Sequence, residues 1–446
     1  MQKLKHSETY LLNFFIIISL NVNPNTFFVT DQIWINIINI LRFFLPTFCL
    51  IYLLYFKLKK KTIYSRSTYP RSINSFLFLI ILYFFVIFVF SLNEIKHPNI
   101  LYFILYLNII IYSWILVNFY DESTNFANLI FAISIYFIFF ILMAGYEFLL
   151  NDVNLLDLRF SKSLRKNDFL LLDNSSARTT GVARSLVLMA LFTIYLIIKQ
   201  KKNNLEKLIF LILSSIFLFI IILSLQSRFG VGIYILTVSY LLIKTRLEKL
   251  RLAIYGILLI LFPIFLYTLI SNNINDRILT QIKEITISSN NSTTNLDKDS
   301  KLEQDAVLEK EPFNEINRLS TGRIQIWSNA FQESKKNYFI FGNGILSDTK
   351  NLKISVSNAL LYSIYTGGIL AAIIYFYINF KIIKYLIFWK EKINNNKINF
   401  LKAILILILI RCLFESSFFA YGYDLLIILI VINIITFKTK FFGKLY

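Results

Sequence analysis

Residues that build metal centres and disulfides are scarce in this sequence. Its 446 residues include 2 cysteines and 2 histidines. Cys49 and Cys412 both lie in apolar segments, and His6 and His97 are far apart along the chain. These four residues offer neither a disulfide framework nor a cluster of thiolate or imidazole ligands. We therefore expect no bound metal and no cofactor.

Acidic residues are also scarce, because 26 Asp and Glu accompany 46 Lys and Arg and leave a net charge of +20. On one soluble surface such an excess would suggest a nucleic-acid partner. Here the cations gather in short loops that fall on one side of a membrane when the apolar segments alternate in direction. These basic stretches are Lys57–Arg71, Lys199–Lys207, Lys244–Arg251, Lys381–Lys397 and Lys438–Lys444. The distribution follows the positive-inside rule, and we expect no nucleic-acid partner.

Apolar sequence is abundant, at 57% of all residues, and only 6 prolines interrupt it. A bilayer core about 30 Å thick is crossed by roughly 20 apolar residues, so the pattern predicts an all-α polytopic membrane protein with eleven or twelve spans. Twelve spans place both termini in the cytoplasm and the basic loops with them. The expected spans are 9–22, 33–56, 76–92, 100–118, 127–150, 183–198, 207–225, 231–243, 252–270, 358–380, 398–413 and 424–437.

Two long polar segments separate these spans and divide the chain. The predicted organisation is an N-terminal membrane region with a periplasmic loop, a central membrane region, a large periplasmic loop with short amphipathic helices, and a C-terminal membrane region. Their bounds are 1–182 (with the loop at 151–182), 183–270, 271–357 and 358–446. The stretch from Arg318 to Gly368 in and beyond the large loop has the most varied side chains, and we expect any chemistry there.

A helix is predicted to start after Ser320 or Thr321, because either residue can cap it and apolar residues follow at helical spacing. The expected apolar stripe is Ile324, Trp327 and Phe331. Arg318 precedes the cap and Arg323 lies in the first turn, so free N–H groups and two guanidiniums would converge in an anion site. An amphipathic helix that keeps its arginines at lipid headgroups is the other interpretation.

Further candidates lie at other outward positions. Arg228 occupies a short outward turn, and Arg178 and Arg184 flank the start of a span. Individually each arginine is explained by headgroup anchoring, but together they suggest a polyanionic ligand. The FGNG segment (341–344) predicts a turn that could bring backbone close to a ligand, and the Ser357–Asn358 pair is typical of a helix cap.

Taken together, these motifs resemble the O-antigen polymerase and O-antigen ligase family of bacterial envelope glycosyltransferases, which are GT-C-like integral membrane proteins. The resemblance covers roughly Arg178 to Gly368, and the flanking spans match only in hydropathy. The matching elements are Arg178 to Gly181 before a mid-chain span, Ser227–Arg228 at a short turn, Arg318, Arg323 and Trp327 in the late loop, Gly342 and Gly344, and Asn358 with Gly367–Gly368 downstream.

The resemblance implies transfer of a glycan from a polyprenyl-diphosphate carrier, such as undecaprenyl diphosphate, to an acceptor hydroxyl at the periplasmic face of the bacterial inner membrane. Its implied partners are the lipid-linked donor, the glycan acceptor, membrane lipids and a chain-length regulator protein. Arginines would stabilise the charge that develops on the diphosphate. The implied catalytic residues are Arg228, Arg318 and Arg323. The implied substrate-binding residues are Arg178, Gly181, Arg184, Trp327, Gly342, Gly344, Ser357 and Asn358.

One departure bears on the reaction. Ligase-type members carry His-Asn where this sequence has Ser357–Asn358, so the resemblance favours a polymerase of surface polysaccharide such as lipopolysaccharide. Glycan transfer to lipid A core or protein, as by a ligase, is one alternative. A flippase for the lipid-linked unit is another, although the sequence shows no repeated halves and concentrates its polar residues in one asymmetric loop.

Overall fold

The structure of the protein is a computed structural model. It describes residues 44–55, 71–92, 97–119, 124–134, 179–200, 204–224, 228–244, 249–268, 323–336, 339–345, 347–351, 358–388, 396–414 and 423–442, with the single residues 16, 138 and 356. Within this part of the chain the elements are helices and short turns, without a strand, which confirms the predicted all-α class. Of the expected spans, 9–22 apart from Ile16, the first part of 33–56 and most of 127–150 lie outside the described residues.

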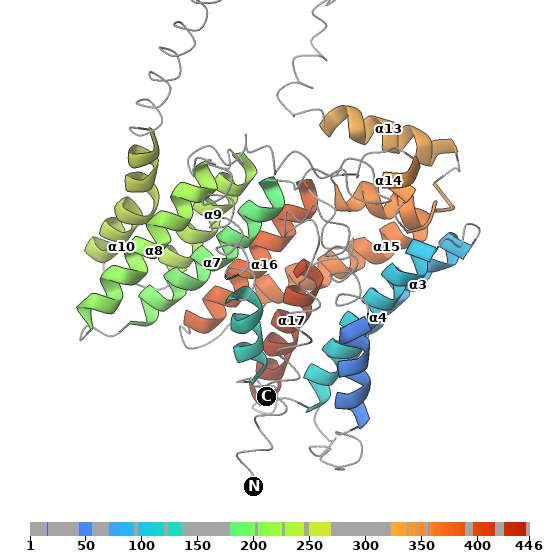
Figure 1. Ribbon diagram of the computed structural model, residues 1–446, viewed down its shortest axis with the longest axis horizontal. Helices are drawn as coiled ribbons and strands as arrows, with labels where there is room; N and C mark the ends of the chain where they lie inside the picture. Colours follow the sequence, from blue (N-terminus) through green and yellow to red (C-terminus); the bar gives the residue numbers. More distant parts are fainter. Residues whose placement is uncertain are drawn as a thin grey trace, which may run out of the picture.

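The labelled helices follow the predicted spans closely where they are described (Figure 1). Helices 44–55 and 124–134 carry no label. The labelled ones are α3 (Arg71–Ser91), α4 (His97–Phe119), α7 (Thr179–Lys199), α8 (Leu205–Ser224), α9 (Arg228–Lys244), α10 (Lys249–Gly256) with the π-helical turn η5 (Ile257–Leu261), α13 (Arg323–Lys336), α14 (Ser347–Asn351), α15 (Ala359–Phe388), α16 (Asn396–Phe414) and α17 (Tyr423–Phe442).

Two of the described helices, α8 and the Ala359–Ile387 part of α15, are long and apolar enough to cross a membrane, and several shorter apolar helices accompany them. Each of the two consists of aliphatic and aromatic side chains over most of its length, so it gains little from water contact. The statement that these two helices could cross a membrane refers to their length and composition.

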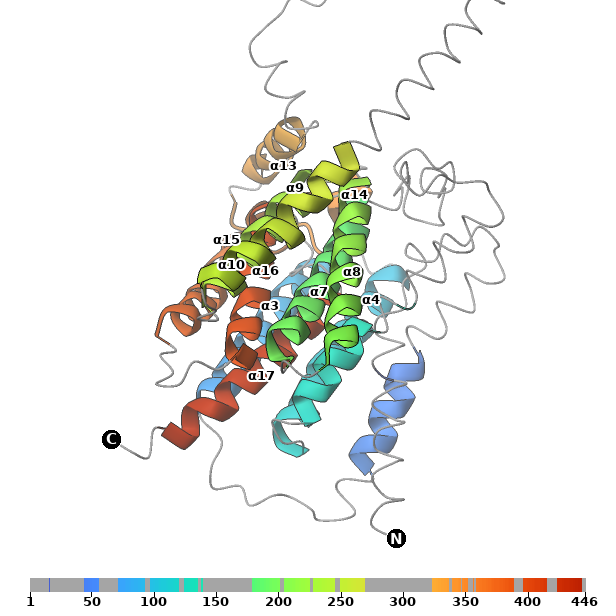
Figure 2. The same cartoon turned by 90° about the vertical axis from the view of Figure 1, so that its left-hand side faces the viewer.

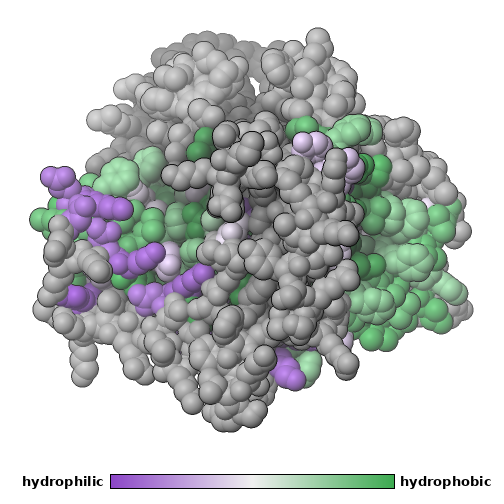
Figure 3. All heavy atoms as spheres, turned by 90° about the horizontal axis from the view of Figure 1, so that it is seen from below, coloured by the Kyte–Doolittle hydropathy of each residue, from purple (hydrophilic) through white to green (hydrophobic). Residues whose placement is uncertain are grey.

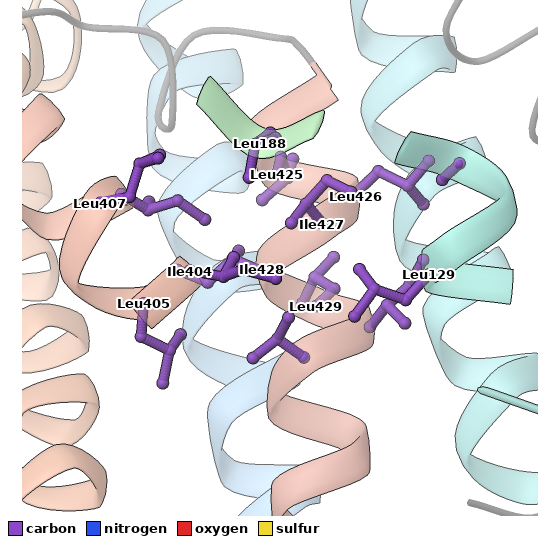
Figure 4. Close-up of a cluster of buried hydrophobic side chains, with 14 of the residues drawn as sticks. Leu129, Leu188, Ile404, Leu405, Leu407, Leu425, Leu426, Ile427, Ile428 and Leu429 are labelled. Atoms are coloured by element: carbon purple, nitrogen blue, oxygen red, sulfur yellow. The ribbon is translucent and has the colours of Figure 1, made fainter. Parts of the chain in front are cut away.

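The core of the bundle is built around α17. Every residue from Leu425 to Ile435 is buried, so this helix is covered on all sides. A helix segment that is apolar all round suits such a central position, because every side of it is removed from water. Figure 4 shows Leu425 to Leu429 between Ile404 and Leu407 of α16 and Leu129 of helix 124–134. Polar contacts in this core are few, and one of them joins α17 to α4: Asn433 Nδ2 donates to the Ser113 carbonyl at 3.4 Å.

Two groups of helices meet at this core. In one group α7 and α9 pack against α16, α8 packs on α7 and α9, and α10–η5 packs on α8 and α9 (Figures 1 and 2). In the other group α15 packs on α3, while α3 and α4 pack on α17. A stacked pair, Phe219 of α8 and Tyr234 of α9, has ring centroids 3.9 Å apart. The Tyr234 hydroxyl then donates to the Leu259 carbonyl at 3.0 Å, within the π-helical turn. The wider turn thus supplies a carbonyl acceptor to a buried phenol.

Two hydrogen bonds between helix ends define the two ends of the bundle. Asn358, at the start of α15, donates from Nδ2 to the carbonyl of Leu413, near the end of α16, at 2.7 Å. At the other end of α16, Asn399 Nδ2 donates to the carbonyl of Lys244, the last residue of α9, at 3.1 Å. We call these the Asn358 end and the Lys244 end.

The same reasoning places the starts of α7 and α9. Tyr195, near the end of α7, stacks on Phe400, near the start of α16, with centroids 4.8 Å apart. Because α7 and α9 both finish at the Lys244 end and pack along α16, both begin at the Asn358 end. Helix α13 lies over α15 at that same end (Figure 1).

Candidate active site at the Asn358 end

Helix α15 is broken at its two glycines. Gly368 has φ 64° and ψ −164°, a backbone conformation that is essentially restricted to glycine. The turn separates a first half from Ala359 to Gly367 from a second half that begins at Ile369. In an uninterrupted helix the Tyr365 and Thr366 carbonyls would accept the N–H groups of residues 369 and 370. The break removes these bonds, so the groups need other partners.

A turn from the large loop supplies those partners. Asn343 N and Gly344 N donate to the carbonyls of Tyr365 and Thr366, each at 2.9 Å. In the opposite sense, Ile369 N donates to the Phe339 carbonyl at 2.7 Å. Residues 339–344, which we call the inserted turn, therefore take over the hydrogen bonds that α15 lost. The predicted turn at FGNG is confirmed, and the backbone that it approaches is that of α15.

Gly342, Gly344 and Gly368 make the close approach of the inserted turn possible, and Gly367 leaves room for α3 and for the next turn of α15. A Cβ atom on Gly368 would collide with the Ile340 carbonyl oxygen, and one on Gly342 would collide with the Thr366 carbonyl. Gly344 has φ +86°, and a Cβ there would lie 2.7 Å from Ser91 Oγ. A Cβ on Gly367 would collide with Ala371. Gly342 and Gly344 thus have a packing role, and their contact with substrate stays a prediction.

Helix α3 closes the other side of the inserted turn. Ser91, at the C-terminus of α3, is 4% exposed and accepts a hydrogen bond from Ile345 N at 2.7 Å. Its hydroxyl donates in turn to the Ile87 carbonyl at 2.9 Å. Further along the two helices, Tyr83 of α3 and Ser363 of α15 join their hydroxyls at 2.8 Å. The turn is therefore held between α3 and the break in α15.

A buried carboxylate orders the chain that leads into α15. Asp348, in α14, is 2% exposed, and its Oδ2 accepts the Val356 N–H at 2.9 Å. Asn358 follows and caps α15, because Oδ1 accepts the Leu361 N–H at 3.0 Å. The cap predicted for this pair is confirmed at Asn358, while Ser357 lies outside the described residues. Asp348 therefore fixes the chain just before Asn358. The resemblance implies that Asn358 binds substrate.

The arginine-bearing helix starts gather at this end of the bundle. Arg228 is the first residue of α9, Arg323 is the first residue of α13, and Arg184 lies in the second turn of α7, close after Gly181. All three helices begin at or over the Asn358 end. Only the backbone of these residues is described. Arg178 and Arg318 lie outside the described residues, and the roles of all five arginines stay predictions.

Helix α13 begins as the sequence predicts, but its buried face differs from the predicted stripe. Ile324 and Trp327 are half-buried as expected, whereas Phe331 is 49% exposed. At this position the small residues Ala330 and Ser334 face the bundle instead, and whether the stripe lies on a membrane surface stays a prediction. They allow close approach to α15, and the Ser334 carbonyl accepts Phe339 N at the start of the inserted turn.

Arg411 is a second buried charge near this end. Its side chain is 2% exposed in α16, two residues before the carbonyl that Asn358 contacts. The spacing of four residues in the sequence makes Glu415 its expected ion-pair partner, and Glu415 lies outside the described residues. Among the described residues no three His, Cys, Asp or Glu side chains come together as metal ligands.

Two important residues of the site escape sequence reasoning. Asp348 lies in a mixed polar stretch, SDTKNLK, which has no periodicity to mark one member as buried. Ser91 lies 254 positions before the turn residue that it contacts. The single available signal is the pairing of two glycine doublets, Gly342/Gly344 and Gly367/Gly368, because closely spaced glycines often mark backbone contact.

Comparisons with known proteins give no relative to set beside this site: no protein-family model matches the chain, and no curated protein or solved structure is similar to it.

Proposed function

We propose that the helical bundle is a polytopic membrane domain. The supporting observation is the row of large apolar side chains that α15 leaves uncovered at helical spacing. The row comprises Ile369, Ile373, Phe376, Phe380, Ile383 and Ile387, which are 43% to 62% exposed. Exposing such a side chain to water forgoes about 1.5–3 kcal/mol of burial free energy, whereas lipid removes this loss. Figure 3 shows an extensive apolar surface on the side where Figure 1 draws α3 and α15.

The distribution of charge supports an orientation. Lys199 and Lys244 end α7 and α9 at the Lys244 end, and Lys381 and Lys384 lie in the last turns of α15. Cations of this kind favour the cytoplasmic side. The Asn358 end then faces the periplasm, in the inner membrane of a bacterium.

For the activity we propose transfer of a glycan from a polyprenyl diphosphate to a lipid-linked acceptor, that is, polymerisation of a surface polysaccharide. An acceptor hydroxyl would form the new bond to the anomeric carbon while the bond to the diphosphate oxygen breaks. The hydroxyl proton leaves to a base, and the diphosphate leaves with its lipid. The observation that carries this proposal is the common location of the helix starts with Arg184, Arg228 and Arg323 beside the entrance to α15.

The geometry explains why this end suits such a reaction. Helix starts present free N–H groups, and guanidinium groups can bind phosphate oxygens in a bidentate manner. Near a membrane the low dielectric strengthens both effects. The rigid inserted turn would hold α13, and with it Arg323, over α15.

One structural feature favours a flippase as a second candidate. Transporters of lipid-linked units and other substrates use broken helices whose free ends bind ligand, and α15 is such a helix. In this protein, however, the inserted turn occupies the Tyr365 and Thr366 carbonyls and the Ile369 N–H. The break is closed by the chain itself, which supports the enzyme.

Arginine variants test the proposed role directly. Replacing Arg228 or Arg323 by Ala should reduce glycan transfer by about 10²–10³-fold, the usual effect of removing one charge-stabilising donor. Arg323→Lys keeps the charge and loses the bidentate geometry, so it should fall between wild type and Ala. Arg251→Ala changes a guanidinium in α10, whose start is at the Lys244 end, and serves as the control. Polymer of unchanged length in Arg323→Ala would contradict the proposal.

The glycan phenotype of a deletion strain separates the candidate functions. A polymerase defect leaves single repeat units attached to the lipid A core. A ligase defect leaves polymer on the carrier lipid and none attached. A flippase defect accumulates the lipid-linked unit on the cytoplasmic side. The proposed function requires the first pattern.

A further inference from the structure

The inserted turn has an exposed apolar tip. Ile340 and Phe341 are 53% and 61% exposed, although the backbone on either side of them is tied to α15. Phe341 contacts Phe90 of α3 edge to face, with centroids 6.1 Å apart, and most of its ring remains uncovered. Two large apolar side chains at the tip of a soluble loop would lie in water at a cost.

The exposed tip is continuous with the uncovered surface of α15. Ile369 and Leu370, directly after the break, are 47% and 48% exposed. Ile369 N is bonded to the Phe339 carbonyl, so the tip lies beside the first residues of the second half of α15. From there the row of exposed residues continues along α15 to Ile387. The tip therefore extends the apolar surface of α15 beyond Ile369.

The backbone groups on either side of the tip are hydrogen-bonded within the protein. Phe339 N donates to the Ser334 carbonyl, and its own carbonyl accepts Ile369 N. The N–H groups of Asn343, Gly344 and Ile345 bond to α15 and to Ser91. Bonds of this kind lower the cost of placing irregular backbone in a membrane, where water is absent.

The turn lies between the last turn of α13 and the break in α15, because Phe339 N donates to the Ser334 carbonyl and Ile369 N donates to the Phe339 carbonyl. Beside the turn, α13 ends with two exposed cations, Lys335 and Lys336, of which Lys336 also pairs with Glu333. Cations in that position suit the phosphate level of a leaflet whose acyl chains surround the tip.

We propose that Phe331 of α13 and residues 339–345 form a re-entrant, membrane-embedded corner instead of a water-exposed part of the large periplasmic loop. Phe331, Ile340 and Phe341 contact the acyl chains of the outer leaflet, and Lys335 and Lys336 contact lipid phosphates. The proposal rests on the membrane part of the proposed function and is independent of glycan transfer. The partner of this surface is the lipid of the outer leaflet.

Site-directed spin labelling of the full chain in lipid nanodiscs tests the corner. Cys49 and Cys412 are first replaced by Ala, and single cysteines are introduced at Phe341, Phe331, Phe376 and Gln332. Phe376 lies in the exposed row of α15 and is the lipid reference, whereas Gln332, an exposed polar neighbour of Phe331, is the water reference. Accessibility to oxygen and to a water-soluble nickel chelate is measured at each label.

Labels at Phe341 and Phe331 are expected to match the Phe376 label, with high oxygen and low nickel accessibility. If they match Gln332 while Phe376 remains lipid-exposed, the re-entrant corner is wrong and the membrane domain stands. If Phe376 is itself accessible to nickel, the membrane domain fails and the corner fails with it. Phe341 and Phe331 are 61% and 49% exposed, and their ring contacts are with the partly exposed Phe90 and Phe339, so their substitution removes no buried core residue.

Discussion

Helices α8 and α15 have similar apolar sequences but use their backbones differently. Along α8 the helix is continuous, and its Ser214 and Ser224 hydroxyls donate to carbonyls of the same helix, Phe210 and Ile221. Along α15 the helix is interrupted at Gly368, and a turn from outside it completes the hydrogen bonds. Apolar composition therefore explains why both are helices, and glycine explains why only α15 binds a second segment.

The comparison also shows what the break provides. A continuous helix such as α8 offers its neighbours only side chains, since its backbone groups are already bonded within the helix. The break exposes two carbonyls and one N–H of α15, and these hold the inserted turn in a fixed register. Helix α13 follows from this register, because its last turn accepts Phe339 N through the Ser334 carbonyl.

The largest effect is expected from replacing Gly368 with Ala, which removes the glycine that interrupts α15 and so makes α15 resemble α8. The backbone conformation alone costs an Ala about 1–3 kcal/mol, and the collision of Cβ with the Ile340 carbonyl adds to that cost. We expect a large loss of stability and release of the inserted turn, measured as thermal unfolding of the purified protein in detergent and as proteolytic cleavage near residue 340.

Gly232→Ala is the matched control, because Gly232 lies in α9 with no atom within 4 Å of a Cβ position. Alanine there gains helix propensity of about 0.8–1 kcal/mol and should leave stability unchanged or raise it. Equal effects of the two substitutions would show that the break in α15 carries no special role.

A second test compares two buried serines at helix ends, Ser91 of α3 and Ser224 of α8. Ser91→Ala leaves the buried Ile345 N–H without its acceptor, which costs about 1–3 kcal/mol. Ser224→Ala removes only a hydroxyl that donates to a carbonyl of its own helix, and we expect a change of a few tenths of a kcal/mol or less. Chemical or thermal unfolding of the two variants measures the difference, and a similar loss in both would contradict the proposed contact between α3 and the turn.

The sequence predicts the helices of this fold well and the join between them poorly. Long apolar runs identify α8 and α15, and Asn358 is recognisable as a cap because local spacing determines both features. The break in α15 is not predicted, since Gly367 and Gly368 sit inside an apolar run that otherwise reads as one span. Its partner, the inserted turn, precedes the break by about 25 residues of chain, and no local pattern connects them.

The candidate site shows the same limit. The helix from Arg323 is predicted from a cap and an apolar stripe, but which face is buried depends on Ala330 and Ser334 meeting α15. Asp348 has no distinguishing local context, because its burial results from the short path between the inserted turn and Val356. Long-range packing, which periodicity cannot report, decides both cases.

The smallest effect is expected from substitutions of the two asparagines that cap α8 and α15. Asn204 caps α8 with Oδ1 3.4 Å from Lys207 N and is exposed, whereas Asn358 caps α15 and also donates from Nδ2 to the Leu413 carbonyl. Aspartate preserves the cap at both sites and removes only the donor. Asn204→Asp should therefore be neutral or slightly stabilising, because a carboxylate suits a helix start.

Asn358→Asp should lower the free energy of unfolding by about 1 kcal/mol, since the Leu413 carbonyl loses its donor and meets a second acceptor. Parallel unfolding curves of the two variants give this difference directly. If Asn358→Asp were as neutral as Asn204→Asp, the contact between α15 and α16 would contribute nothing beyond the cap. The Asn358 end of the bundle would then be held by the inserted turn and side-chain packing alone, and Asn358→Ala should cost no more than loss of an ordinary cap, about 0.5–2 kcal/mol.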